Sequence, residues 1–523
     1  MPAFPRRRLK GSFARKPVLA VGLAILADLL FWGRPAGASL GLFALALCAA
    51  SWVGRPAPPG DRRARWALAA AAVLALTQIE QPSLAGMALF GAAAGIAALS
   101  GRVGPREDVW RWLQRLAALV VCAPAGPVLD GLRLARRRPR RPSQGGAWRL
   151  AQTLLWPLAG GAVFLGLFAL ANPVIAQAMA QLRLPRPEVG RIMFLLLTAV
   201  AAWALLRPRR LRRTLAPPEG PAGLPGVAAG SAALSLVVFN LLFAVQNGLD
   251  IAFLWSGAPL PAGVILADYA HRGAYPLVAT ALLAGLFVLT ALRPGSDDAG
   301  RPLIRGLVSL WVAQNVFLTA SAALRTLDYV GAYSLTRLRL AALIWMGLVA
   351  VGLVLICWRL LRGKSAGWLI DANALAAAAV LAAVGLVDLG AVSAAWNVRH
   401  AREAGGAGAA LDICYLRVLG ASALVPLAEL EQRPLDPELR DRVAWARTAA
   451  ARDLEARQAD WRGWTWRGAR RLAAAARLSP GRGVLATPAP GPRDCDGFLQ
   501  RPPAPPPAEA DRAVAPLTAA PQG

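Results

Sequence analysis

The chain has 523 residues, of which 56% are hydrophobic and 17% charged, and its formal net charge is +29. Soluble proteins carry about a quarter charged residues, so this composition argues against a soluble protein. It favours an all-α, polytopic transmembrane helical bundle with a C-terminal helical extramembrane tail. Most arginines flank apolar segments, as the positive-inside rule requires. We therefore expect a lipid bilayer as partner and no nucleic acid.

Apolar segments long enough to cross ~30 Å of hydrocarbon recur along the chain. The first follows a basic N-terminus and is expected to remain as an uncleaved membrane helix. About eleven spans are predicted, near residues 17–33, 38–54, 66–80, 84–100, 150–171, 192–206, 224–246, 273–292, 306–324, 337–358 and 369–389.

The loops between these spans predict the orientation of the chain. Basic clusters occupy alternate loops, at 6–16, 55–65, 102–149, 207–213 and 358–364. The positive-inside rule places these loops and the N-terminus in the cytoplasm. The loops at 172–191, 247–272 and 325–336 then lie outside, and an odd number of spans puts the C-terminus outside as well.

Composition also divides the chain into five regions. They are N-terminal transmembrane hairpins (1–100), a basic cytoplasmic loop whose segment 110–133 fits an interfacial helix (101–149), the main bundle (150–390), a C-terminal helical region (391–477) and a Pro-rich tail expected to be disordered (478–523).

The five cysteines form no Cys-x-x-Cys pair and no zinc-type cluster with histidine, so we expect no metal and no cofactor. Cys414 and Cys495 both lie in the tail. They are able to pair if the tail faces an oxidising compartment. Two free thiols are an equally open alternative at this stage.

Polar residues concentrate where four predicted spans meet the outer loops. Residues 267–276, ADYAHRGAYP, hold an acid, two tyrosines, a histidine and an arginine. Hydrocarbon penalises unpaired polar groups, so such residues should face protein or water and mark a site. Decoration of the membrane interface is the competing interpretation. The candidate polar site comprises Asn240, Gln246, Asn247, Asp250, Asp268, Tyr269, His271, Arg272, Tyr275, Gln314, Asn315, Arg325, Asp328, Tyr329, Tyr333 and Arg337.

Several strings in the second half of the chain resemble a known family. They are residues 246–277, 309–346 and 396–401 (WNVRHA), together with 411–431 and 460–467. They are similar to bacterial integral membrane proteins grouped as domain of unknown function 4173, which is close to 4153. The resemblance implies a bacterial cytoplasmic (inner) membrane protein. It implies no activity, substrate or catalytic residues.

Three functions compete at this stage. Transport or handling of an envelope solute or lipid through the polar cluster is the first, with His271 able to titrate near neutrality. A membrane-embedded enzyme acting on an envelope substrate is the second, with Asp268, Asp250 or His271 as acid or base. No recognised nucleophile or metal motif supports it. The third is a non-catalytic scaffold or sensor whose tail binds an envelope protein.

Overall fold

The computed structural model describes residues 8–54, 61–104, 107–137, 188–209, 213–217, 229–256, 302–478 and 486–500, with isolated positions between 154 and 172 and at 279 and 283. Most of these residues are helical, and the β-pairing among them is one isolated bridge, Arg493 with Leu499. The all-α class is therefore confirmed. The chain divides into two compact units, residues 1–79 with 87–216 and residues 80–86 with 217–523.

Five described helices are long and apolar enough to cross a membrane, and the chain is a multi-pass membrane protein. They are α9 (Val189–Leu206), α10 (Ala229–Asp250) continued by the π-helical turn η1 (Ile251–Trp255), α13 (Pro302–Tyr333), α14 (Arg337–Arg362) and α15 (Ala366–Leu386). A sixth arises if α5 (Val109–Val121) and α6 (Ala125–Arg137), which meet at a 71° bend, form one broken span.

The expectation of about eleven spans is not confirmed. Two of the expected spans form helices α2 (Ala38–Val53) and α4 (Leu84–Ser100), whose 16 and 17 residues fall short of the usual length. Two others coincide with α1 (Arg8–Phe31) and α3 (Arg62–Glu80), which carry several charged residues. The expected spans at 150–171 and 273–292 fall almost wholly outside the described residues.

In the first unit, α1 packs along α9. Ala20 and Leu23 of α1 form a buried core with Trp203 of α9. Arg191 of α9 forms an ion pair with Asp28 of α1 at 2.6 Å. Small side chains also permit close packing, since a Cβ on Gly41 of α2 would collide with α3.

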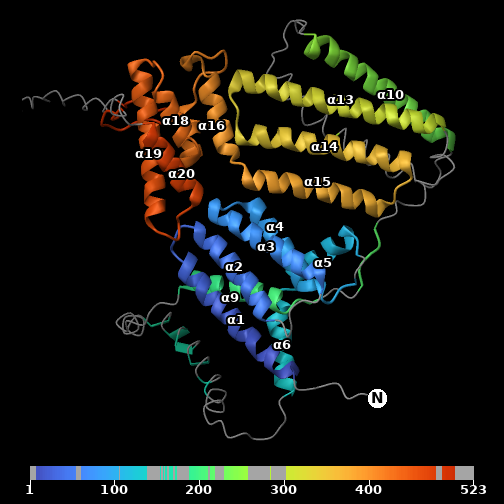
Figure 1. The fold of residues 1–523 in the computed structure, drawn as a ribbon, viewed down its shortest axis with the longest axis vertical. Coiled ribbons are helices and arrows are strands. Elements are labelled where there is room, and N and C mark those ends of the chain that lie inside the picture. The colour runs from blue at the N-terminus through green and yellow to red at the C-terminus, as the bar shows by residue number, and fades with distance from the viewer. Residues whose placement is uncertain are drawn as a thin grey trace, which may run out of the picture. The chain divides into compact units, whose positions relative to one another are not determined.

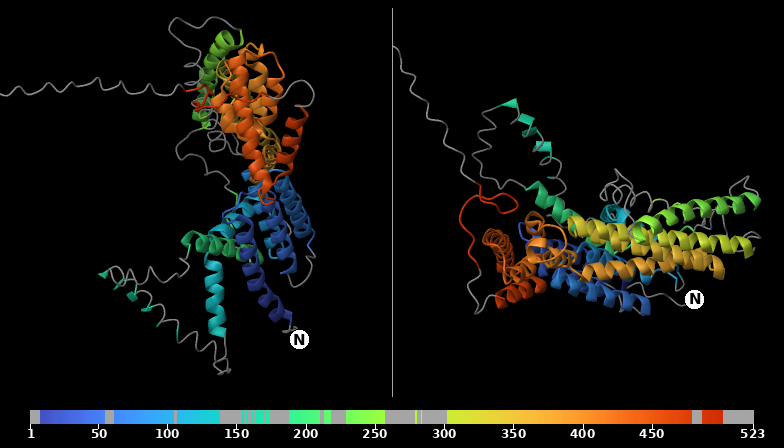
Figure 2. Two further views of the ribbon diagram at one scale, coloured as in Figure 1. Left: turned by 90° about the vertical axis from the view of Figure 1, so that its left-hand side faces the viewer. Right: turned by 90° about the horizontal axis from the view of Figure 1, so that it is seen from above.

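The second unit contains a layer of long apolar helices. Neighbours in sequence are neighbours in space, with α10 packed on α13, α13 on α14 and α14 on α15 (Figures 1 and 2). The core between α10, α13 and α14 is formed by apolar side chains that include Leu236, Val308 and Leu353.

Helices α10 and α13 run in the same direction. The Asn240 side chain contacts the carbonyl of Leu307, and further along both helices the Trp255 indole contacts Ser321. The expected span at 273–292 falls almost wholly outside the described residues and stays a prediction.

The C-terminal region consists of helices stabilised by side-chain caps. They are α16 (Leu389–His400), α17 (Ile413–Leu419), α18 (Leu424–Glu431), α19 (Pro437–Ala459) and α20 (Trp466–Arg477), with 3-10 turns η2 (Arg402–Ala404) and η3 (Gly420–Ser422). Asp388, Asp412, Asp436 and Thr465 each accept a hydrogen bond from a backbone N–H in the first turn of the helix that follows.

The C-terminal helices hold the loop that joins α13 to α14. Asn397 forms two hydrogen bonds with the backbone of Leu335, at 2.7 and 2.9 Å, and Ser393 donates a third at 2.6 Å. The backbone N–H of Arg337 donates to the Tyr415 hydroxyl at 2.7 Å. The end of the membrane layer at this loop is thus fixed to α16 and α17.

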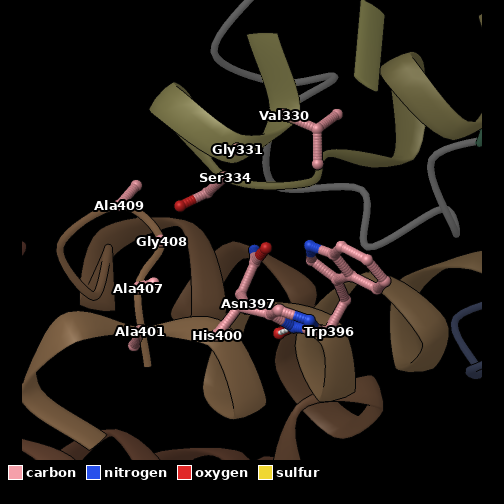
Figure 3. Close-up of a pocket in the computed structure, with 10 residues that line it drawn as sticks. All are labelled: Val330, Gly331, Ser334, Trp396, Asn397, His400, Ala401, Ala407, Gly408 and Ala409. Carbon is pink, nitrogen blue, oxygen red and sulfur yellow. Dashed lines mark hydrogen bonds between the residues drawn. The ribbon is translucent and has the colours of Figure 1, made fainter. Parts of the chain in front are cut away.

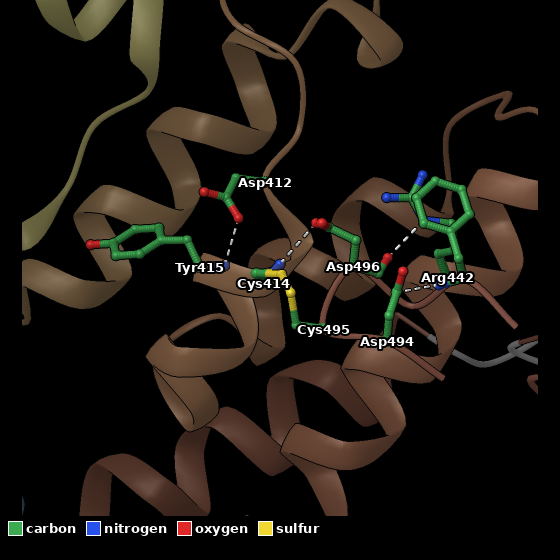
Figure 4. Close-up of a disulfide and its surroundings, with 8 residues drawn as sticks. Asp412, Cys414, Tyr415, Arg442, Asp494, Cys495 and Asp496 are labelled. Carbon is green, nitrogen blue, oxygen red and sulfur yellow. Dashed lines mark hydrogen bonds between the residues drawn. A yellow bond between two sulfur atoms is a disulfide. The ribbon is translucent and has the colours of Figure 1, made fainter. Parts of the chain in front are cut away.

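Part of the Pro-rich tail is folded, contrary to the expectation of disorder from residue 478 onward. Residues 486–500, here called the strap, pack against α17, α18 and α19. A disulfide joins Cys414 to Cys495, and the Arg442 guanidinium donates to the carbonyl of Asp496 at 2.7 Å (Figure 4). Composition missed this because the strap is ordered by a covalent bond and by polar contacts, not by an apolar core of its own.

The strap gives the first testable prediction, a loosening in acid. Its Arg493 pairs with Asp441 at 2.7 Å and holds the pKa of that carboxyl below the ordinary value, while the Ala489 N–H adds a 2.7 Å hydrogen bond. Because the folded pKa is lowered, the contact stabilises the strap above the unfolded pKa of about 3.9 and is lost as the pH falls through the folded pKa.

Hydrogen exchange of the Ala489 amide, corrected for the intrinsic rate, should therefore accelerate between about pH 4 and the folded pKa. In Asp441→Asn the exchange should already be fast and should show no such step. A step of equal size in both proteins would contradict the assignment.

Candidate functional site

The buried and half-buried polar side chains between α10 and α13 form the candidate site. We call this set the polar seam, which consists of Asn240, Gln246, Asn247, Asp250, Gln314, Asn315, Ser321 and Arg325. Both helices are candidate membrane spans. Polar groups at that depth face one another because lipid offers no partner.

Amide side chains form the first part of the seam. Gln314 donates from Nε2 to Oδ1 of Asn240 at 2.7 Å. Asn240 in turn donates to the carbonyls of Leu236 and Leu307 at 2.8 and 3.1 Å. Two turns further along α10, Asn247 donates to the carbonyl of Gln314 at 3.3 Å. These contacts tie the two helices together through groups that apolar packing does not require.

A buried ion pair lies at the far end of the seam. Arg325 pairs with Asp250, and their side chains are 4% and 0% exposed. The same carboxylate oxygen accepts a hydrogen bond from Gln246 at 2.9 Å. Removing two charges from water costs several kcal/mol per ion, so stability alone is a poor reason for such a pair.

The π-helical turn η1 follows the ion pair directly. It carries Trp255, whose indole donates to Ser321 at 3.0 Å and stacks on Phe317 with ring centroids 5.5 Å apart. A π-turn within an apolar helix often marks a functional position. Here it closes the seam with an aromatic side chain.

Four buried oxygen atoms of the seam have no hydrogen-bond donor among the described residues. They are Oδ1 of Asn247, Oδ2 of Asp250, Oε1 of Gln314 and Oδ1 of Asn315. A buried acceptor without a donor costs about 1–3 kcal/mol. The seam is therefore rich in acceptors, and its chemistry suits a molecule that supplies hydrogen-bond donors.

The structure brings together seven of the residues that the sequence selected: Asn240, Gln246, Asn247, Asp250, Gln314, Asn315 and Arg325. Asp268, Tyr269, His271, Arg272 and Tyr275 lie outside the described residues. Their place in the site stays a prediction.

The remaining four candidate residues lie beyond the seam, near the loop between α13 and α14. They are Asp328, Tyr329, Tyr333 and Arg337. Tyr329 and Tyr333 contact each other with centroids 4.6 Å apart, and the Arg339 guanidinium lies over the Tyr329 ring. Asp328 and Arg337 are exposed. These residues form an aromatic and basic cluster at the helix end, as side chains at a membrane interface do.

Nothing in the sequence indicated a cavity that lies apart from the seam. This junction pocket, of about 310 Å³, lies between the end of α13 (Val330, Gly331, Ser334), α16 (Trp396, Asn397, His400) and residues 401–409 (Figure 3). In the sequence, the string WNVRHA (396–401) indicated only a family resemblance. His400, one of two histidines in the chain, was the available signal that this string also carries chemistry.

Comparison with known families identifies one match. A family model described as domain of unknown function (DUF4153) matches residues 66–430. The related name 4173 is not the one matched, and the match begins well before the second half of the chain. Comparison with curated proteins and with solved structures gives no match.

Proposed function

The chain belongs to the family described as domain of unknown function DUF4153, and we propose that it moves or handles an envelope solute or lipid headgroup through the polar seam. The observation that carries this proposal is the buried Asp250–Arg325 pair together with the four unmet acceptors beside it. Intramembrane ionisable residues mark ion and substrate paths by default.

The parallel packing of α10 and α13 supports this proposal. A polar path between two helices serves transport if it continues through much of their length. The seam runs from Asn240, beside Leu307, to Trp255, beside Ser321, and so occupies the C-terminal part of the candidate span Ala233–Trp255. Helix α13 also carries apolar side chains outside the seam, such as Leu310, which is 53% exposed.

We further propose a bacterial inner membrane location with the C-terminal helices outside the cytoplasm. Two independent features support this orientation. Arg359, Arg362 and Lys364 lie at the end of α14 away from the C-terminal helices, as the positive-inside rule requires of a cytoplasmic end. The Cys414–Cys495 disulfide needs an oxidising compartment.

Water access to the seam tests the proposed function. In a background with Cys48, Cys122 and Cys357 replaced by alanine, Asn247→Cys and Gln314→Cys should react with a small polar methanethiosulfonate reagent much faster than Leu310→Cys. A thiol in apolar surroundings stays protonated and unreactive. Equally slow reaction at all three positions would mean a dry, purely structural seam and would refute a solute path.

The orientation has its own test. In the same background, Val418→Cys on α17 is expected to react with a membrane-impermeant maleimide in intact cells, because Val418 is 71% exposed. Lys364→Cys should react only after the cells are permeabilised. The reverse pattern would place the C-terminal helices in the cytoplasm.

A further inference from the structure

We propose that the junction pocket binds a neutral sugar ring, either as a free saccharide or as the headgroup of a lipid. The pocket lies outside the polar seam, and its assignment does not depend on the proposed function. Its volume of about 310 Å³ is at the lower end of the range for small-molecule sites, which suits a single ring.

The lining residues favour an uncharged ligand. None of the ten lining residues is Asp, Glu, Lys or Arg. An anionic headgroup would meet no cation in the lining, and a cationic ligand would meet no carboxylate. The polar side-chain groups that remain are a hydroxyl, an imidazole, a carboxamide and an indole N–H.

His400 supplies an oriented acceptor. Its Nδ1 lies 2.9 Å from the carbonyl oxygen of Trp396. A carbonyl only accepts, so Nδ1 carries the hydrogen in the neutral ring. Nε2 is then an acceptor for a ligand hydroxyl. The Ser334 hydroxyl forms no hydrogen bond with the described residues and is able to donate or accept. Two hydrogen bonds to the backbone of Leu335 fix the Asn397 carboxamide in the pocket wall.

Trp396 supplies the apolar surface. It lines the pocket, is 41% exposed, and stacks on His400 with centroids 3.8 Å apart and planes inclined by 17°. A sugar ring presents hydroxyls at its edge and C–H groups on its face, so it suits an aromatic wall beside a few placed polar groups.

The pocket is built in advance of binding. Ser334 has φ of 68°, the one positive value among described non-glycine residues, and such strained residues cluster at ligand sites. A Cβ on Gly406 would collide with the carbonyl of His400, and one on Gly408 would lie 2.6 Å from that oxygen. Only glycine lets this loop pack so close to His400.

The two histidines of the chain make a direct test possible. In His271→Asn, labelled with ¹³C at histidine Cε1 and held in a nanodisc, the NMR signal reports His400 alone. Methyl β-glucoside is the free-sugar probe, a monoglucosyl diacylglycerol in the nanodisc is the lipid probe, and glycerol 3-phosphate is the anionic control. We expect a saturable shift with a sugar probe and none with glycerol 3-phosphate.

Two variants separate binding from folding. Ser334→Gly removes the hydroxyl but also relieves the strained backbone, so it should fold at least as stably and bind the sugar several-fold more weakly. Trp396→Leu should abolish the shift, whereas Trp461→Leu, another exposed tryptophan of the C-terminal region, should leave it unchanged.

A shift with methyl β-glucoside supports a free saccharide, and a shift with the glycolipid alone supports a lipid headgroup. No shift with either sugar, or an equal shift with glycerol 3-phosphate, would overturn the proposal. The proposal also fails if Trp396→Leu and Trp461→Leu change the ligand-induced shift of His400 equally. Each result is independent of thiol reactivity in the seam.

Discussion

Replacing Arg325 with methionine is expected to reduce the free energy of unfolding by about 3–5 kcal/mol. The change leaves the Asp250 carboxylate, which is fully buried in α10, without its counter-charge. Gln246 alone then donates to it. The measurement is reversible unfolding in bicelles by titration with a denaturing detergent.

The double variant Asp250→Asn/Arg325→Met should recover most of that loss. It removes both charges together, and replacement of a whole buried pair by neutral groups is often close to neutral for stability. Arg337→Met is the matched control, because Arg337 is exposed at the start of α14. Equal losses for Arg325→Met and Arg337→Met would show that the buried pair is not special.

Replacing Cys495 with serine has the second largest expected effect. The disulfide joins residues 81 positions apart. Closing a loop of this length stabilises the fold by about 4 kcal/mol, chiefly by restricting the unfolded chain. The strap should separate from α19 more readily, because its other contacts are polar and partly exposed.

Trypsin offers a local measurement of this release. The Arg493 side chain is 1% exposed and paired with Asp441, so wild-type protein should resist cleavage after Arg493. Cys495→Ser should be cut there rapidly, and a reducing agent should produce the same cut in the wild type. Cys122→Ser, which changes an exposed free cysteine, serves as control. If Cys495→Ser stays resistant under these conditions, the disulfide does not hold the strap.

The helical class and most residues of the polar seam could be predicted from the sequence, because both depend on local patterns. An apolar stretch around Asn240 and another around Gln314 each indicated a span, and a polar side chain in such a span must find a partner in protein. The sequence did not show which of these polar side chains contact one another. Tyr333 and Arg337 lie apart from the seam because η1 ends at Trp255, beside Ser321, and does not reach them.

The number of spans and the junction pocket could not be predicted in the same way. Hydropathy treats α2 and α3 as spans although one is short and the other carries charge at both ends. Ser334 and His400 are 66 positions apart and come together because Asn397 and Ser393 bind the backbone of Leu335. Contacts of that kind leave no periodic trace in a sequence.

The loop between α13 and α14 has a consequence for biosynthesis. Its partners Ser393, Asn397 and Tyr415 follow it by 58 to 78 residues, and Tyr415 adjoins the cysteine that pairs with Cys495. The ribosome synthesises α13 and α14 before it synthesises the residues that bind the loop between them. Every newly made molecule therefore passes through a stage in which both helices exist but their loop is still unsecured. A chain truncated before residue 393 would remain at that stage permanently.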